Sequence, residues 1–97
     1  MSYTVKWLPE AELTYALVLE YLDENWTTKE IEKFIDRTDE VINFISQNPE
    51  QYFYLKKKNS YRAVVTKHVS LYYKIQSTEI ELLIFWDNRQ DPEKLKL

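Results

Sequence analysis

Three strand-like segments follow one another closely before residue 92, and this arrangement restricts the possible folds more than any other feature of the sequence. The segments span residues 61–65, 70–75 and 80–86, and β-branched and aromatic side chains dominate them. Four residues connect each segment to the next. Because connections of this length join antiparallel neighbours and are too short for a crossover, the sequence predicts an antiparallel three-stranded meander.

A further strand and a helix begin the chain. Residues 3–7 alternate apolar and polar side chains, which is the period of a strand with one buried face, so the odd-numbered side chains are expected to point inward. Residues 10–25 carry apolar side chains at every third or fourth position, which predicts a helix that starts near Pro9. Three more residues widen the apolar stripe, which predicts contacts with the sheet and with a second helix or a partner: Leu13, Leu17 and Tyr21.

A second helix is expected to follow after a tight turn. Thr27 and Glu30 have the spacing of a capping box, and Trp26 and Ile31 occupy the positions of a hydrophobic staple. The helix is predicted to end at Asn48, since the proline that follows cannot continue it. The two helices therefore form an αα-hairpin.

The last strand of the meander carries apolar side chains on both faces. We expect the even-numbered residues from Ile80 to Trp86 to face the core, and Leu83 and Phe85 to lie on the other face. Residues 51–60 are interpreted as a connector without a strand. The predicted fold is α+β, with the order β-α-α-β-β-β: a four-stranded, mainly antiparallel sheet with the helical hairpin on one face and the first strand beside one of the later three. The other face is then partly bare and needs a partner.

Composition excludes several classes of site. The 97 residues are enough for one domain, which we take as residues 1–97. The sequence contains no Cys, which excludes disulfides and thiolate sites, and no Gly, which excludes Gly-rich phosphate loops. A single His gives no metal-ligand spacing, so neither a metal nor a cofactor is predicted. The net charge of −3 does not favour a polyanion, and the absence of a signal peptide or apolar span favours a cytoplasmic protein without membrane contact.

The order of one strand, two helices and three strands resembles the RelE/ParE family of toxins from bacterial type II toxin–antitoxin pairs. The resemblance covers nearly the whole chain. Its specific marks are Tyr73 and Ile75 in one strand, Arg89 beyond the last strand, and the Asn-Pro pair at 48–49. The resemblance implies a growth-inhibiting toxin, of the kind associated with plasmid stabilisation, that forms an oligomeric complex with a cognate antitoxin.

The RelE-like branch of this family cleaves mRNA on the ribosome, with two lysines, two arginines and a tyrosine at recurring positions. In this sequence those positions fall on Arg62, Val64, Ser70, Arg89 and near Leu95. Only two cations remain, and no acid replaces the tyrosine. Each lost contact to the phosphate is worth on the order of 2–4 kcal/mol. The chain therefore resembles the ParE-like branch more closely, whose members inhibit DNA gyrase and need no catalytic set.

The resemblance implies two groups of functional residues. Arg62, Arg89 and Asp91 are candidates for contact with the target, and Leu83 and Phe85 are candidates for contact with the antitoxin. The antitoxin is expected to bind as a helix in a groove or as an added strand.

Two other functions stay open from the residues alone. The first is a ribosome-dependent mRNA endoribonuclease, for which the catalytic candidates are Arg62, Arg89, His68 and Lys67. The second is a binding module of the same fold without toxicity. His68 fits an ordinary turn histidine better than a catalytic one, although a carboxylate brought near it would make an acid–base pair. Arg89 fits a strand-end ion pair and a functional site equally well.

Overall fold

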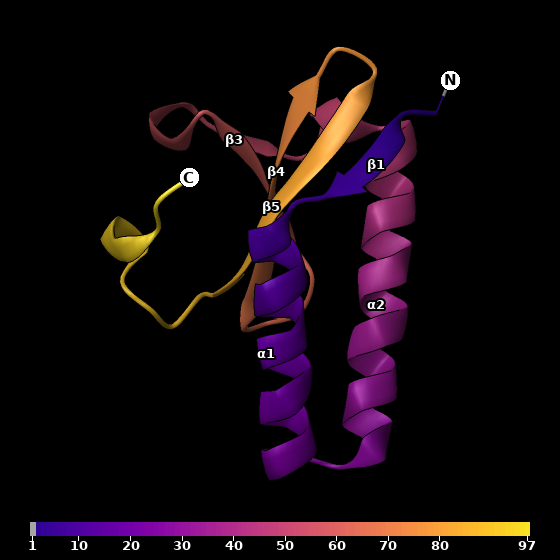
Figure 1. The fold of residues 1–97 in the computed structure, drawn as a ribbon, viewed down its shortest axis with the longest axis vertical. Helices are drawn as coiled ribbons and strands as arrows, with labels where there is room; N and C mark the ends of the chain where they lie inside the picture. Colours follow the sequence, from indigo (N-terminus) through magenta and orange to yellow (C-terminus); the bar gives the residue numbers. More distant parts are fainter. Residues whose placement is uncertain (1) are drawn as a thin grey trace.

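The computed structural model describes residues 2–97, which form two helices, five strands and three short 3-10 turns (Figure 1). The α+β class, the helical hairpin and the antiparallel meander are confirmed. The sheet has the order β1-β5-β4-β3-β2, and every neighbouring pair is antiparallel except β1 and β5. The elements are β1 (Thr4–Trp7), α1 (Pro9–Asn25), α2 (Thr28–Gln47), β2 (Phe53–Leu55), β3 (Ser60–Val64), β4 (Val69–Gln76) and β5 (Glu79–Asp87).

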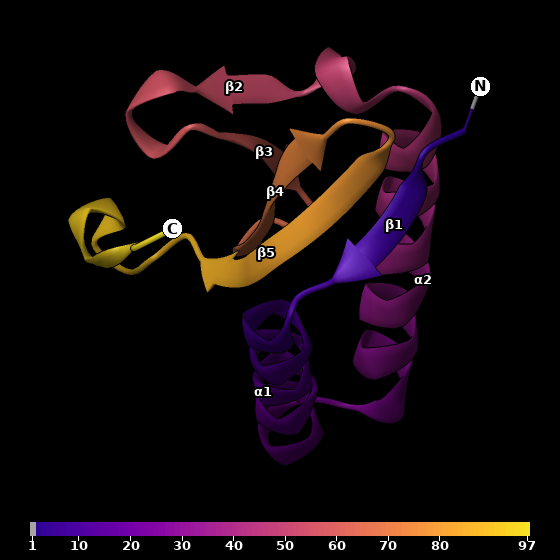
Figure 2. The same cartoon turned by 45° about the horizontal axis from the view of Figure 1, so that its top comes forward.

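The sheet has one strand more than predicted. β2 lies inside the segment interpreted as a connector and pairs antiparallel with β3 through Phe53↔Arg62 and Leu55↔Ser60. Three residues are too few to show a period of two, so only the pairing with β3 defines this strand. The structure also shows which of the later strands pairs with the first: β1 runs parallel to β5 (Figure 2), with Val5 opposite Ile80. A parallel neighbour is possible here because the helical hairpin and the meander lie between the two strands in sequence.

The predicted alternation of β5 holds only up to Leu82. Tyr73 of β4 is opposite Leu82 and Tyr72 is opposite Ile84, so a β-bulge leaves Leu83 without a partner. The extra residue reverses the alternation beyond it. Phe85 therefore points toward the helices and is only 3% exposed. The prediction that Phe85 is exposed on the second face of the sheet is wrong, and so is the prediction that the even-numbered residues face one core.

Aromatic rings from four elements meet where the helices cover the sheet. The ring of Phe85 lies 5.5 Å from Trp7, 5.1 Å from Tyr15 and 6.5 Å from Phe34, measured between centroids. These residues belong to β5, β1, α1 and α2, so the cluster joins the sheet to both helices. Its spacings are those of favourable aromatic pairs. The odd-numbered side chains of residues 3–7 pack against the same core, as expected from their alternation.

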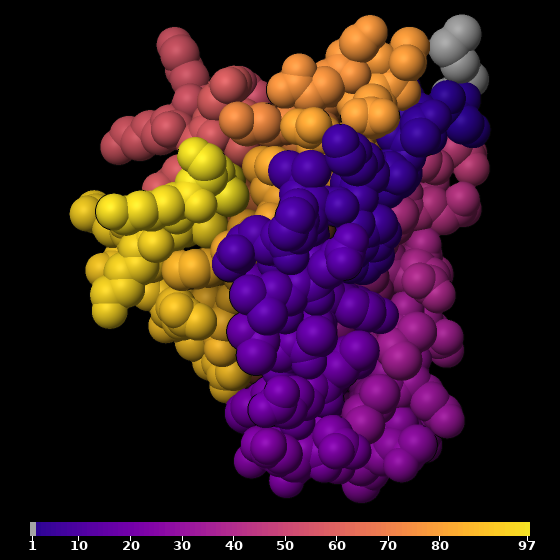
Figure 3. Space-filling view, viewed as in Figure 1, coloured from indigo at the N-terminus to yellow at the C-terminus, as the bar shows by residue number. Residues whose placement is uncertain are grey.

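The second face of the sheet is covered in part by the C-terminal segment, which Figure 3 shows packed beside β5. Leu95 is 1% exposed and packs with Tyr72 and Ile84. Lys58 Nζ donates to the carbonyl oxygen of Leu95 at 2.6 Å, which holds the segment from the β2–β3 connection. Leu83 lies on this face and packs at the edge of the same small cluster. The face is therefore less bare than the sequence indicated.

The helix boundaries agree with the sequence, but the capping box does not form. Thr27 is the N-cap of α2, yet its hydroxyl makes no capping hydrogen bond. The N–H of Glu30 instead donates to the backbone carbonyl of Thr27 at 3.0 Å, which satisfies the same amide. α2 ends at Asn48 as predicted. Neither helix within residues 2–97 is long and apolar enough to cross a bilayer.

Candidate functional site

An open groove of about 880 Å³ lies between the helical hairpin and one end of the sheet. Apolar side chains of α1, α2 and β5 form much of its lining, including Leu17, Phe34 and Phe85. Basic residues also line it, from α2, the β3–β4 turn and the segment after β5: Lys33, Arg37, Lys67, His68 and Arg89. The acidic residues of the lining are Glu10, Glu30 and Asp87. The groove thus combines an apolar surface with an excess of positive charge on a chain whose net charge is −3.

One wall of the groove is α1, which is attached to the free edge of β5. β1 pairs with β5 only as far as Trp7↔Leu82, so the next part of β5 lacks a strand on that side. The N–H of Phe85 donates instead to Thr14 Oγ1 at 2.9 Å. This bond satisfies a backbone amide at a strand edge and fixes α1 against it. The following turns of α1 carry Leu17 and Tyr21 into the lining of the groove.

The turn between β3 and β4 forms another part of the groove and is held by backbone bonds. The N–H of Val65 donates to Val69 O at 2.9 Å, and the N–H of Asn88 donates to His68 O at 2.7 Å. From α2, Arg37 Nε donates to Val65 O at 3.1 Å. These bonds place Lys67 and His68 in the lining, beside the end of β5.

Arg89 is fixed at the groove by Asp87. Its Nε and Nη2 donate to the two carboxylate oxygens at 3.0 and 2.8 Å, and its backbone N–H donates to Oδ1 at 2.9 Å. The guanidinium carbon also lies 6.0 Å from the centroid of the Tyr21 ring, within the range of a cation–π contact. The side-chain hydrogen bond from Arg89 lowers the pKa of Asp87, and the same contact raises the pKa of Arg89. The geometry is bidentate, so it fixes the direction in which this exposed cation points.

The structure separates the residues that the sequence singled out. Lys67, His68 and Arg89 line one groove together. Arg62 lies on the opposite face of the sheet, where its Nε donates to Ser70 Oγ at 3.1 Å. Asp91 is not part of the groove lining either. Its carboxylate accepts the N–H of Glu93 at 3.0 Å and caps the last 3-10 turn.

Sequence reasoning did not identify several groove residues as site residues. Tyr21 and Trp26 were interpreted as parts of an apolar stripe and of a staple, and Arg37 was not singled out. The available signal was the excess width of the apolar stripe on α1, because the residues that widen it stay about half exposed: Leu13, Leu17 and Tyr21. Within residues 2–97, no group of three or more His, Cys, Asp or Glu side chains is placed to hold a metal ion.

The ion pair of Asp87 and Arg89 predicts a specific pH response. Because the pKa of Asp87 is lowered from its ordinary value of 3.8, the pair's contribution to stability is complete above that value and is lost as the pH falls through the lower, folded-state pKa. Carbon-detected NMR titration of the full chain should therefore place the Asp87 midpoint below 3.8. Arg89→Ala is expected to move the midpoint up toward 3.8, whereas the control Lys33→Ala leaves it in place. An unchanged midpoint in Arg89→Ala would contradict the assigned contact.

Comparison with known proteins shows which solved structures share this fold. No protein-family model matches the sequence, and no curated protein matches it. Solved structures do match. A chain of the chromosomal ParDE toxin–antitoxin system from P. aeruginosa is 12% identical, with 89% of this chain and 96% of that chain covered and a TM-score of 0.75. The YoeB dimer from Staphylococcus aureus matches at 14% identity, with coverages of 89% and 97% and a TM-score of 0.59.

The RelBE2 toxin–antitoxin complex from Mycobacterium tuberculosis matches at 17% identity, with coverages of 90% and 99% and a TM-score of 0.54. All three likenesses extend over nearly the full length of both chains. The resemblance inferred from the sequence is thus confirmed for the fold: this chain has the fold of RelE/ParE toxins.

Proposed function

We propose that this chain is the toxin component of a type II toxin–antitoxin pair, that it acts in the cytoplasm, and that a cognate antitoxin neutralises it. The fold supports this proposal, since the matched structures come from the ParDE and RelBE2 toxin–antitoxin systems and from YoeB. Fold alone does not imply function, so the choice of a target depends on the residues of the groove and the sheet.

The target that the residues support best is DNA gyrase, as in the ParE-like branch of the family. The observation that carries this choice is the separation of the two arginines. Arg62 lies on one face of the sheet and Arg89 on the other, beside α1. Two cations on opposite faces cannot stabilise the same phosphate, which RNA cleavage of the RelE kind requires. Ser70, at the position of another cation, is 0% exposed.

Among the candidates for contact with the target, Arg89 has the strongest case. It is exposed, and Asp87 and Tyr21 hold it in one orientation, so little side-chain entropy is lost when a partner binds. Arg62 is only partly exposed, and the carboxylate of Asp91 caps a turn outside the groove. Arg62 and Asp91 therefore rank behind Arg89 as target contacts.

The groove is the surface that we assign to the antitoxin. We expect the antitoxin to bind the groove with an amphipathic helix. Apolar residues of α1 stay about half exposed along the wall of the groove, and the apolar face of such a helix would cover them. The surplus of basic side chains around the groove favours a segment with acidic residues beside its apolar face. Leu83 remains a second candidate, on the other face of the sheet. An antitoxin that reaches both regions would form the oligomeric complex expected from the resemblance.

The alternative of a ribosome-dependent mRNA endoribonuclease rests on a different observation. Lys67, His68 and Arg89 line the same groove, and so does Asp87, which pairs in the sheet with Val69, the residue after His68. A histidine, two cations and a carboxylate are groups from which general acid–base cleavage of RNA is built. In this alternative the residues that line the groove, and not Arg62, would catalyse the cleavage of RNA.

A paired assay with purified protein separates the two targets. The chain should block supercoiling of relaxed plasmid by DNA gyrase and leave mRNA on translating ribosomes uncut. Arg89→Ala is expected to raise the concentration needed for half-inhibition by roughly tenfold or more, as for a central interface arginine. The control Lys33→Ala removes a groove cation of α2 away from the end of β5 and should have a smaller effect. Cleavage of mRNA with undisturbed supercoiling would reject gyrase as the target.

A further inference from the structure

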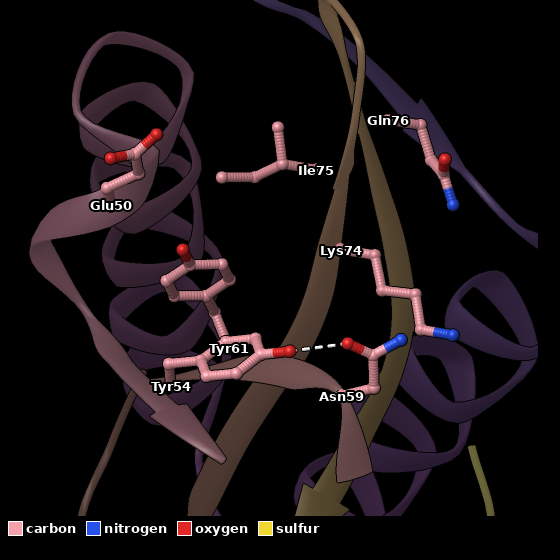
Figure 4. Close-up of a pocket in the computed structure, with 7 residues that line it drawn as sticks. All are labelled: Glu50, Tyr54, Asn59, Tyr61, Lys74, Ile75 and Gln76. Atoms are coloured by element: carbon pink, nitrogen blue, oxygen red, sulfur yellow. Dashed lines mark hydrogen bonds between the residues drawn. The ribbon is translucent and has the colours of Figure 1, made fainter. Parts of the chain in front are cut away.

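A second hollow, of about 460 Å³, lies at the far end of the sheet from Arg89, and Figure 4 shows the residues around it. It exists because β4 is longer than the strand beside it. Pairing between β3 and β4 stops at Tyr61↔Tyr73, while β4 continues to Gln76 in its pairing with β5. At this point the chain leaves the sheet through Asn59, whose φ of 50° is in the left-handed region. The hollow therefore occupies the place of an absent strand.

The edge of β4 in this hollow presents backbone groups that can bond. β4 and β5 are joined by the two-residue loop Ser77–Thr78, and Ser77 has the positive φ, 58°, that a type II′ turn needs at its first position. In such a hairpin Gln76 and Glu79 form the hydrogen-bonded pair, and the alternate residue, Ile75, directs its N–H and C=O away from β5. Those two groups point into the hollow, which Ile75 lines.

The side chains around this edge carry opposite charges on two sides. Glu50 and the hydroxyl of Tyr61 lie on one side, and Asn59 and Lys74 lie on the other (Figure 4). The hydroxyl of Tyr54 donates to Asn59 Oδ1, which fixes the amide of Asn59 at the mouth of the hollow. Burial of the ring and, to a smaller extent, the carboxylate of Glu50 raise the pKa of Tyr61, so its hydroxyl stays protonated and can donate a hydrogen bond.

We propose that this hollow, which we call the β4 notch, binds a short extended peptide segment with a basic residue flanked by an acidic one. The segment would add to the sheet through hydrogen bonds to Ile75, as in strand addition. Side chains alternate along a strand, so the basic residue would lie over Ile75 and Tyr61 with its charge at Glu50. Its neighbour would then point to the opposite side, where its carboxylate meets Lys74.

The length and the charges of the β4 notch fit a short basic–acidic peptide better than a second copy of this chain. At this end of β4, Lys74, Ile75 and Gln76 lack a β3 partner, so about three residues of peptide can pair there. A second copy of this chain, added through its own β4 edge in antiparallel register at Ile75, would bring Lys74 next to Gln76 and leave Glu50 without a cation. A basic–acidic peptide satisfies both charged side chains. The notch is separate from the groove beside Arg89, so this proposal does not depend on the function proposed for the groove.

Two blocked tripeptides test the proposal in ¹H–¹⁵N NMR titrations of the full chain. Acetyl-Glu-Arg-Thr-amide should give saturable shifts of the Ile75 and Asn59 amides while the amide of Phe34 in the groove stays unchanged. The charge-exchanged acetyl-Arg-Glu-Thr-amide should bind more weakly. Glu50→Gln removes an exposed charge without disturbing the core and should weaken binding of the first peptide up to about fivefold.

Three results would overturn the proposal. They are no saturable shift at Ile75, equal binding of the two peptides together with no effect of Glu50→Gln, and shifts at Ile75 that depend on protein concentration without peptide. The last result would assign the notch to a second copy of the chain.

Discussion

Replacing Phe85 with alanine is expected to lower the free energy of unfolding by about 3–5 kcal/mol, the range for loss of a buried phenylalanine. Phe85 is 3% exposed, and its ring contacts Trp7, Tyr15 and Phe34. The cavity left by the ring would lie between the sheet and both helices, where the packing of three elements prevents a simple collapse. Chemical denaturation with urea, followed by circular dichroism, measures this change.

Phe53→Ala is the matched control because it removes the same ring from the same sheet. Phe53 is 70% exposed on the edge strand β2, so its loss should cost less than about 1 kcal/mol. The comparison tests the β-bulge at Leu83 directly. Equal and small losses for the two variants would mean that Phe85 faces solvent, as a regular alternation along β5 requires, and that the bulge is absent.

Local sequence patterns predicted the parts of the fold that local physics determines. The short connections within the meander allowed only antiparallel pairing, and the proline at position 49 ended α2 where expected. The parts that were missed depend on tertiary contacts. β2 is a strand only because β3 lies beside it, and the bulge at Leu83 interrupts a period that the sequence shows as regular. Thr27 occupies the predicted cap position, but the N–H of Glu30 donates to the backbone carbonyl of Thr27 and not to its hydroxyl.

The candidate site could be predicted only in part, for a similar reason. Lys67 and His68 are separated from Arg89 in sequence by the full length of the β4–β5 hairpin. The groove joins them because the bond from Asn88 to His68 brings the hairpin ends together. The sequence showed that these residues are polar and near strand ends, but not which face of the sheet they share. Arg62 is the clearest case, since alternation along β3 turns it away from Arg89.

Induced expression of this chain alone in a bacterium is expected to stop growth. The proposed toxin has the complete sheet, groove and fixed Arg89 in a single chain, so it needs no activating partner. The arrest should come with the DNA-damage response and loss of plasmid supercoiling, since blocked gyrase produces both. Arg89→Ala, expressed at the same level, should weaken the arrest, while Phe53→Ala should leave it intact.

The growth curve after induction is the most direct test of the claim that this fold, with this groove, belongs to a toxin. If the chain is such a toxin, division stops while the wild-type chain accumulates in folded form, and growth resumes when a cognate antitoxin is supplied. Unchanged growth in the presence of abundant folded wild-type chain would contradict it and would favour a binding module of the same fold without toxicity.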